Sequence, residues 1–80
     1  MLLDDAGGLT WHQASTGTVS ADNCFDIFGI YECYDGLPEG SMHNSVLVFK
    51  IMPNWYAQIC VTRSGLKSRL YNAANWGTWN

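Results

Sequence analysis

The clearest pattern of apolar and polar positions lies in residues 55–63. Four odd-numbered positions of this segment share one side of an extended chain and are apolar: Trp55, Ala57, Ile59 and Val61. Even-numbered positions share the other side: Tyr56, Gln58, Cys60 and Thr62. A repeat of two residues is the period of a β-strand, so the pattern predicts a strand here.

Short strands are also predicted at residues 30–34, 45–52 and 66–71, with tight turns between them. Turn residues occur at Asp35-Gly36, Pro38 to Gly40, Pro53-Asn54 and Ser64-Gly65. Ser20 is placed to cap one short helical turn. Consecutive strands joined by tight turns predict an all-β fold, a small antiparallel β-meander or sandwich. We assign it to residues 21–80 and expect residues 1–20 to be an extended N-terminal arm or connector.

The composition of the chain indicates that it needs partners. Of its 80 residues 48% are hydrophobic and only 14% are charged, against about 25% charged in a typical soluble domain. A chain this short buries only roughly 60% of the surface that its unfolded form exposes. Much apolar surface would therefore face water in a single copy, and other subunits are one way to cover it.

Charge and hydropathy exclude several classes of protein. The net charge of −3 and the lack of a basic tract argue against nucleic-acid binding. The longest purely apolar run, residues 46–49, is far too short to span a membrane as a helix. All seven acidic residues lie at or before Glu39 and all four basic residues lie after it. If this is not chance, the acidic half lies against the basic half, within one chain or between copies.

The three cysteines, Cys24, Cys33 and Cys60, are odd in number and widely spaced, and they form no C-x-x-C motif. We expect them to be reduced and structural, with Cys60 buried in an apolar run, as in proteins that assemble in a reducing cell interior.

Four short motifs occur in a fixed order along the chain. They are Gly29-Ile30-Tyr31, Leu37-Pro38-Glu39-Gly40, a mid-strand Gln58, and the ending Arg69-Leu70-Tyr71-Asn72 to Trp76-Gly77-Thr78-Trp79. In this order they resemble the pyocin-knob domains at the tips of bacteriophage tail fibres and R-type pyocin fibres. The resemblance covers about residues 20–80. Ser68 departs from it, since an aromatic residue often precedes the family's arginine, and His43-Asn44 replace smaller residues.

The resemblance implies a small β knob that assembles as a homotrimer on a fibre axis and recognises the host surface. The function we expect is non-enzymatic, multivalent binding of a host cell-surface glycan by a tail fibre tip. The expected partners are copies of the chain, other phage tail proteins and the glycan, with no nucleic acid and no membrane insertion. The location is the virion tail fibre, assembled in the host cytoplasm. The alternative is a structural module that trimerises or caps the fibre and has no receptor site.

Aromatic, amide and cationic side chains near the turns are the candidate glycan contacts. Aromatic rings stack on sugar C–H groups, amides bind hydroxyls and an arginine grips an anionic group. The candidates are Asn54, Trp55, Tyr56, Arg69, Asn75 and Trp76.

Structural roles compete with each of these assignments. Trp55 would lie on a buried face with Ile59 and Val61. Arg69 would pair with an acid of the first half: Asp22, Asp26 or Glu32. If the last residues are extended, Trp76 and Trp79 point to opposite faces, and one or both plug the subunit interface.

Gln58, Tyr71 and Trp79 are expected to serve the trimer or the fold. A buried Gln58 needs hydrogen-bond partners, which a copy across a threefold axis would supply.

Catalysis, metal binding and cofactors are not indicated. His12 and His43 are far apart in the chain and lack metal-ligand spacing. A hydrolase would need two carboxylates about 5–9 Å apart, and here the acids lie mostly in turns and the arm.

Overall fold

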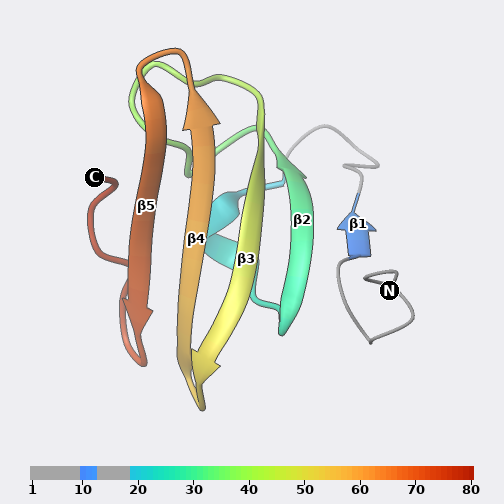
Figure 1. Cartoon of the computed structure of the whole chain (residues 1–80), viewed down its shortest axis with the longest axis vertical. Helices are drawn as coiled ribbons and strands as arrows, with labels where there is room; N and C mark the ends of the chain where they lie inside the picture. Colours follow the sequence, from blue (N-terminus) through green and yellow to red (C-terminus); the bar gives the residue numbers. More distant parts are fainter. Residues whose placement is uncertain (1–9, 13–18) are drawn as a thin grey trace.

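Five strands form one mixed sheet in the order β1-β2-β3-β4-β5 (Figure 1). The computed structural model describes residues 10–12 and 19–80. Its elements are β1 (Thr10–His12), the 3-10 helix η2 (Ala21–Asn23), β2 (Phe28–Cys33), β3 (Asn44–Met52), β4 (Trp55–Thr62) and β5 (Gly65–Asn72). The predicted all-β meander is confirmed for β2 to β5, which pair antiparallel in sequence order. Among the described elements, no helix is long and apolar enough to cross a membrane.

One pairing departs from the expected antiparallel pattern. Thr10–His12, expected as part of the arm, forms β1 and pairs with β2 in parallel, with Trp11 opposite Ile30 and His12 opposite Tyr31. The remainder of the arm, residues 1–9 and 13–18, lies outside the described residues. The chain between β1 and β2 includes η2, whose Ser20 cap accepts a hydrogen bond from the Asp22 N–H, as predicted.

The strand register divides the sheet into two faces. Directly paired residues point to the same side, so each row of partners across the sheet belongs to one face. Two rows on one side are Gly29–Val48–Gln58–Arg69 and Tyr31–Val46–Cys60–Lys67. Two rows on the other side are Phe28–Phe49–Ala57–Leu70 and Ile30–Leu47–Ile59–Ser68.

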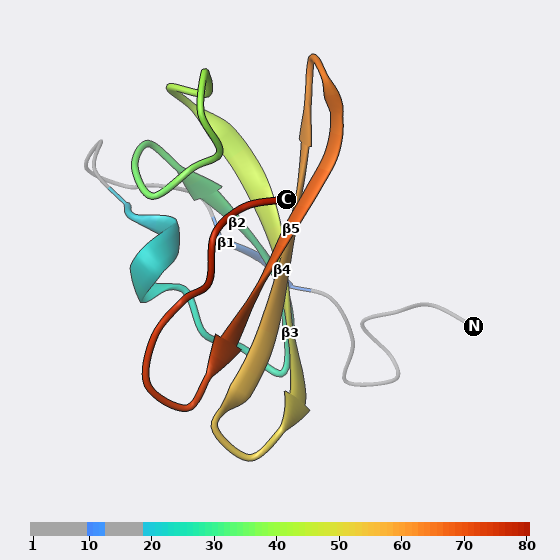
Figure 2. The same ribbon diagram turned by 90° about the vertical axis from the view of Figure 1, so that its left-hand side faces the viewer.

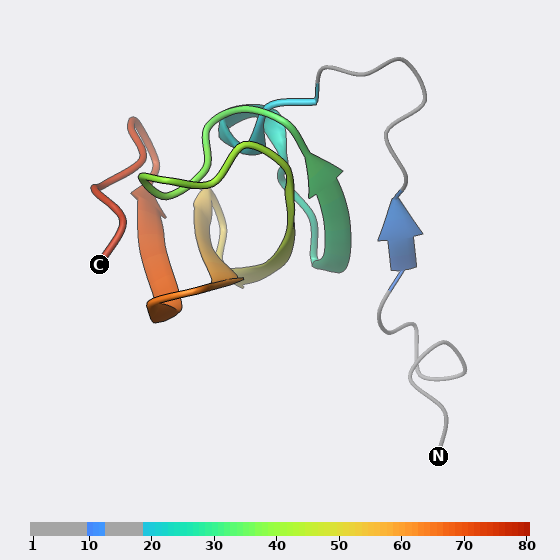
Figure 3. The same ribbon diagram turned by 90° about the horizontal axis from the view of Figure 1, so that it is seen from above.

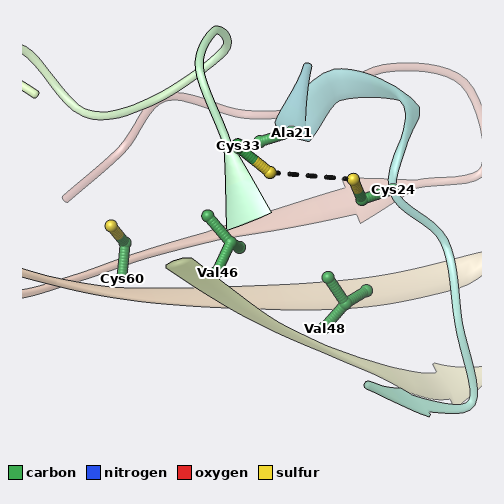
Figure 4. Packing of buried hydrophobic residues seen from close by; sticks show 6 residues of the cluster. All are labelled: Ala21, Cys24, Cys33, Val46, Val48 and Cys60. Atoms are coloured by element: carbon green, nitrogen blue, oxygen red, sulfur yellow. Dashed lines mark hydrogen bonds between the residues drawn. The ribbon is translucent and has the colours of Figure 1, made fainter. Parts of the chain in front are cut away.

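The face that includes Gln58 is covered by the chain itself. Figures 2 and 3 show η2, the 34–43 connection and the C-terminal segment on the same side of the sheet. The segment of residues 19–27, which includes η2, is called the covering segment below. The core between it and the sheet is small and built from compact side chains: Ala21, Cys24, Cys33, Val46, Val48 and Cys60 (Figure 4). All three cysteines are buried and free, which places Cys60 in the core as expected.

Gln58 fastens the covering segment to the sheet. Its side chain is fully buried, and its amide group donates to the carbonyl oxygens of Ala21 (2.7 Å) and Cys24 (3.2 Å). Its Oε1 accepts from the Nε of Arg69 at 2.8 Å. The expectation that Gln58 is structural agrees with these contacts, but its partners lie in the same chain and not in a copy across an axis.

The opposite side of the sheet, called the open face below, is apolar; most of its residues in β2 to β4 are half-buried, and it is exposed at the end of β4 and along β5. Val61 is 64% exposed, Leu66 67% and Leu70 51%. Glu32, at the end of β2, is the charged residue of this face among the described strands. The alternative role given to Trp55 is therefore corrected. Its side of β4, with Ile59 and Val61, is the open one, and the buried side carries Gln58 and Cys60.

Replacement of Gln58 tests its role in the fold. Gln58→Leu keeps a similar volume but leaves Arg69 Nε and the Cys24 carbonyl without partners and removes one of two hydrogen bonds to the Ala21 carbonyl. Each buried group left without a partner costs about 1–3 kcal/mol. We expect the free energy of unfolding in urea to fall by about 3 kcal/mol or more. Thr78→Ala, at an exposed C-terminal position, is the control. A Gln58→Leu chain as stable as this control would contradict the role.

Candidate functional site

Arg69 lies at the centre of a buried polar and aromatic cluster on the covered face. It comes from the middle of β5 and is only 7% exposed. Its Nη1 contacts Asp22 Oδ1 at 2.9 Å, and its Nε donates to Gln58. Asp22 is thus the partner of Arg69, in agreement with the alternative in which an acidic residue of the first half pairs with this arginine. The acidic and basic halves of the chain thus touch at this point.

Two indole rings pack on the Arg69 guanidinium. Its central carbon lies 4.4 Å from the ring centroid of Trp76 and 4.5 Å from that of Trp79. The expectation that the two rings point to opposite faces of an extended chain is wrong, because residues 77–80 are irregular and both rings converge on one cation. Cation–π contacts of this kind are favourable, the more so when the cation is shielded from water.

Backbone carbonyls hold both rings in place. Trp76 Nε1 donates to the Asp22 carbonyl and Trp79 Nε1 to the Gly36 carbonyl, each at 3.0 Å. Gly36 has a φ of 68°, and a Cβ there would lie 2.8 Å from Ser20 Oγ. Glycine is thus required at this turn both for the positive φ and for the close approach of the chain.

Burial sets the electrostatics of the cluster. Loss of solvent lowers the pKa of Arg69, and the hydrogen bond with Asp22 acts against this, so the group stays a cation paired with a carboxylate. Its Nη2 is buried without an oxygen partner among the described residues. The two indole rings packed on the guanidinium shield it from water and attract its charge through cation–π contacts.

An aromatic pocket opens beside this cluster, at the edge of the covering segment. Phe25 meets Tyr56 and Tyr71 edge-on, with centroids 5.1 and 4.8 Å apart, and stacks on Trp76 at 5.4 Å. The pocket has a volume of about 540 Å³. Aromatic, amide and charged groups line it together with one alanine: Asp22, Phe25, Arg69, Tyr71, Ala74, Asn75 and Trp76.

This pocket brings together part of the predicted set. Arg69, Asn75 and Trp76 line it, as does Tyr71, expected as structural. Tyr56 joins through its contact with Phe25. Asn54 and Trp55 lie away from this set: Asn54 is exposed in the β3–β4 turn with a φ of 64°, and Trp55 belongs to the open face.

Sequence reasoning missed Phe25 as a wall of the pocket. The only available signal was an apolar residue two positions after the capped turn at residues 20–23.

A second polar group joins β1, the covering segment and β2. Asp26 Oδ2 accepts from the Tyr31 hydroxyl at 3.0 Å and lies 3.1 Å from His12 Nε2, while the rings of His12 and Tyr31 stack at 4.1 Å. A Cβ on Gly29 would lie 2.5 Å from this carboxylate oxygen. The Gly29-Ile30-Tyr31 motif therefore provides the space and the hydroxyl donor that Asp26 needs.

His43 repeats this arrangement at the other end of β2. It stacks on Tyr34 at 4.1 Å and contacts Glu32 at 2.7 Å. It also lines a pocket of about 730 Å³ between residues 39–44 and 61–64. Within residues 10–12 and 19–80, no three or more His, Cys, Asp or Glu side chains are grouped so that they would hold a metal ion.

Comparison with protein-family models, curated proteins and solved structures found no match for this chain.

Hydrogen bonding to Asp26 predicts a loss of stability in acid. Burial raises the pKa of Asp26, but hydrogen bonds from Tyr31, His12 and the backbone outweigh this and hold it below its ordinary value of 3.8. The unfolded chain therefore takes up this proton more readily, and stability present above about pH 4 is lost as the pH falls further. We expect Asp26→Asn to make the free energy of unfolding in urea less dependent on pH in this range.

The control for this test is Asp35→Asn, which removes a carboxylate at an exposed position. The role of Asp26 would be refuted if both variants kept the pH dependence of the parent chain.

Proposed function

We propose that this chain is a non-enzymatic tip domain of a phage-type tail fibre, which assembles as a homotrimer and binds a host cell-surface glycan. The observation that carries the proposal is the contrast between the two faces of the sheet. One face is sealed by the chain's own segments, while the other stays apolar. The order of the four motifs, beginning with Gly29-Ile30-Tyr31, supports the proposed kinship with pyocin-knob domains, and a small all-β fold is consistent with it.

A second copy of the chain is the occupant that best suits the open face. The residues that β2 to β5 place on the open face are almost all uncharged, so two copies could pack there without electrostatic repulsion. This part of the sheet covers on the order of 500 Å², taking about 4.8 Å between strands and about 3.3 Å per residue. A specific interface buries at least about 1,000 Å² in total, half from each partner. The face thus supplies about the area that one chain contributes to an interface with one other copy.

The aromatic pocket supports glycan binding on the opposite side of the sheet. Its edges offer ring surfaces from Phe25 and Tyr71, the amide of Asn75 and the carboxylate of Asp22, whose side chain is 56% exposed. Oδ1 of Asp22 is engaged by Arg69, which leaves the second oxygen to accept from sugar hydroxyls. Stacking rings beside acceptors and donors form the usual chemistry of a sugar site. Three such weak sites on one tip would bind through avidity.

The structural alternative also has an observation in its favour. Both indole N–H groups at the C-terminus bond to backbone carbonyls, and both rings pack on Arg69. Trp76 and Trp79 therefore serve the fold whether or not a ligand is bound. A module that only trimerises or caps a fibre would need these contacts and no pocket.

The first test concerns assembly through the open face. Light scattering at micromolar concentration is expected to give about three times the chain mass of 8.9 kDa. Val61→Asp places a charge in the proposed interface and is expected to yield monomers. Ser64→Asp adds the same charge in the neighbouring exposed turn and is expected to stay trimeric. A monomeric parent chain, or a trimeric Val61→Asp variant, would count against assembly through this face.

The second test concerns the pocket. An array of bacterial surface polysaccharides is expected to give binding by the trimer, which calorimetry then quantifies. Asn75→Ala removes an amide at the pocket and is expected to weaken the affinity about tenfold, as for loss of one hydrogen bond of about 1.4 kcal/mol.

Asn54→Gly is the matched control for this test, since glycine keeps the positive φ of its turn. We expect it to bind like the parent. If a trimer forms but no polysaccharide on the array binds it, the capping module is favoured instead.

A further inference from the structure

Two of the buried cysteines lie in contact although they come from different parts of the fold. Cys24 belongs to the covering segment and Cys33 ends β2, and their Sγ atoms are 3.8 Å apart (Figure 4). Cys24 is 2% exposed and Cys33 is fully buried. Each thiol also lies near a backbone carbonyl, that of Ser20 for Cys24 and that of Tyr31 for Cys33. These contacts hold the two sulfur atoms next to each other in the core.

The environment of the pair makes its two sulfurs unequal. The hydrogen bond from Cys33, aided by the charge of Arg69, lowers the pKa of Cys24 despite its burial. The same hydrogen bond and burial raise the pKa of Cys33, and burial alone raises that of Cys60. Two thiols in contact, one of them with a lowered pKa, allow one sulfur to react with an oxidant and the other to resolve the product.

We propose that Cys24 and Cys33 form an intramolecular disulfide when the chain meets hydrogen peroxide. The Cys24 thiolate attacks one peroxide oxygen, the O–O bond breaks, and hydroxide leaves to become water, so that Cys24 carries a sulfenic acid. Cys33 sulfur then attacks Cys24 sulfur, the S–O bond breaks, and the oxygen leaves as water with the Cys33 proton. Two thiols and one peroxide thus give one disulfide and two waters.

The disulfide would add a covalent link where hydrogen bonds now hold the covering segment. In the reduced chain, Gln58 fastens this segment through two carbonyls, one of which belongs to Cys24 itself. A disulfide from Cys24 to Cys33 would link the covering segment to the end of β2 and close the loop of residues between the two cysteines. A chain that assembles reduced would gain this staple after release into an oxidising medium. The proposal does not rest on the fibre function or on the trimer.

The test uses the full chain, treated with one equivalent of hydrogen peroxide and cleaved without reduction. Trypsin cuts after Lys50 and Arg63, so it separates Cys60 from the other two cysteines. We expect residues 1–50 to lose the mass of two hydrogen atoms and the Cys60 peptide to stay unchanged. Chymotrypsin cuts between Cys24 and Cys33, at Phe28 and Tyr31, and is expected to give two peptides joined through sulfur.

Thermal unfolding measures the effect of the link. We expect the oxidised chain to unfold roughly 10 °C or more above the reduced chain, with reversal by a thiol reductant. Cys60→Ala keeps the pair and is expected to show the same shift. Individual oxidation to sulfinic acids, a bond to Cys60 or to another chain, or a disulfide without a rise in Tm would each overturn the proposal.

Discussion

The fold depends on the hydrogen bonds of one buried amide. Gln58 lies in β4, near the middle of the sheet. Its side-chain N–H groups donate to two carbonyls of the covering segment, and its Oε1 accepts a hydrogen bond from the Nε of Arg69. Hydrophobic burial alone would hold that segment weakly, because the fully buried part of the core consists of alanine, valines and cysteines, and the larger side chains around it are only partly buried. A buried amide with both donors and its acceptor engaged fixes one position for the segment, since any slip leaves polar groups without partners.

Arg69 extends this constraint to the C-terminus. Its Nη1 holds Asp22, and its flat guanidinium receives the rings of Trp76 and Trp79. The C-terminal residues then run along β5, with Ser68 and Asn80 exchanging two backbone hydrogen bonds. Gln58, Arg69 and the two tryptophans thus close one side of the sheet with polar and aromatic contacts, and the aliphatic side chains of β5 remain on the other side.

The contrast between the covered face and the open face of the sheet explains which parts of the fold could be predicted from the sequence. Alternation and turn residues locate β2 to β5, because a strand period and a tight turn are local properties. The buried face was not predictable in the same way. Trp55, Ile59 and Val61 are more apolar than the Gln58 side of β4, so a rule based on hydropathy selects the wrong face. The polar side is buried because partners distant in the chain satisfy it.

The site was only partly predictable for the same reason. Arg69, Asn75 and Trp76 lie close together in sequence and share a pocket, whereas Phe25 and Asp22 reach it across the fold. The pairing of β1 with β2 and the contact between Cys24 and Cys33 are also set by tertiary structure. The Gly29-Ile30-Tyr31 motif indicates close packing at Gly29, but the sequence does not show that the Asp26 carboxylate is the group that packs there.

The covering segment links the site to stability, while the open face stands apart from both. Asp22 and Phe25 line the pocket, and their neighbours Ala21 and Cys24 accept the hydrogen bonds of Gln58. A ligand bound only when this segment is in place must stabilise it by mass action, and whatever fastens the segment must also favour the ligand. The side chains in the rows of Phe28 and Ile30 point to the other side of the sheet, away from the face on which the segment and the pocket lie. In the function proposed above, recognition and assembly would use opposite faces of the sheet, and a substitution on one face would change one property without the other.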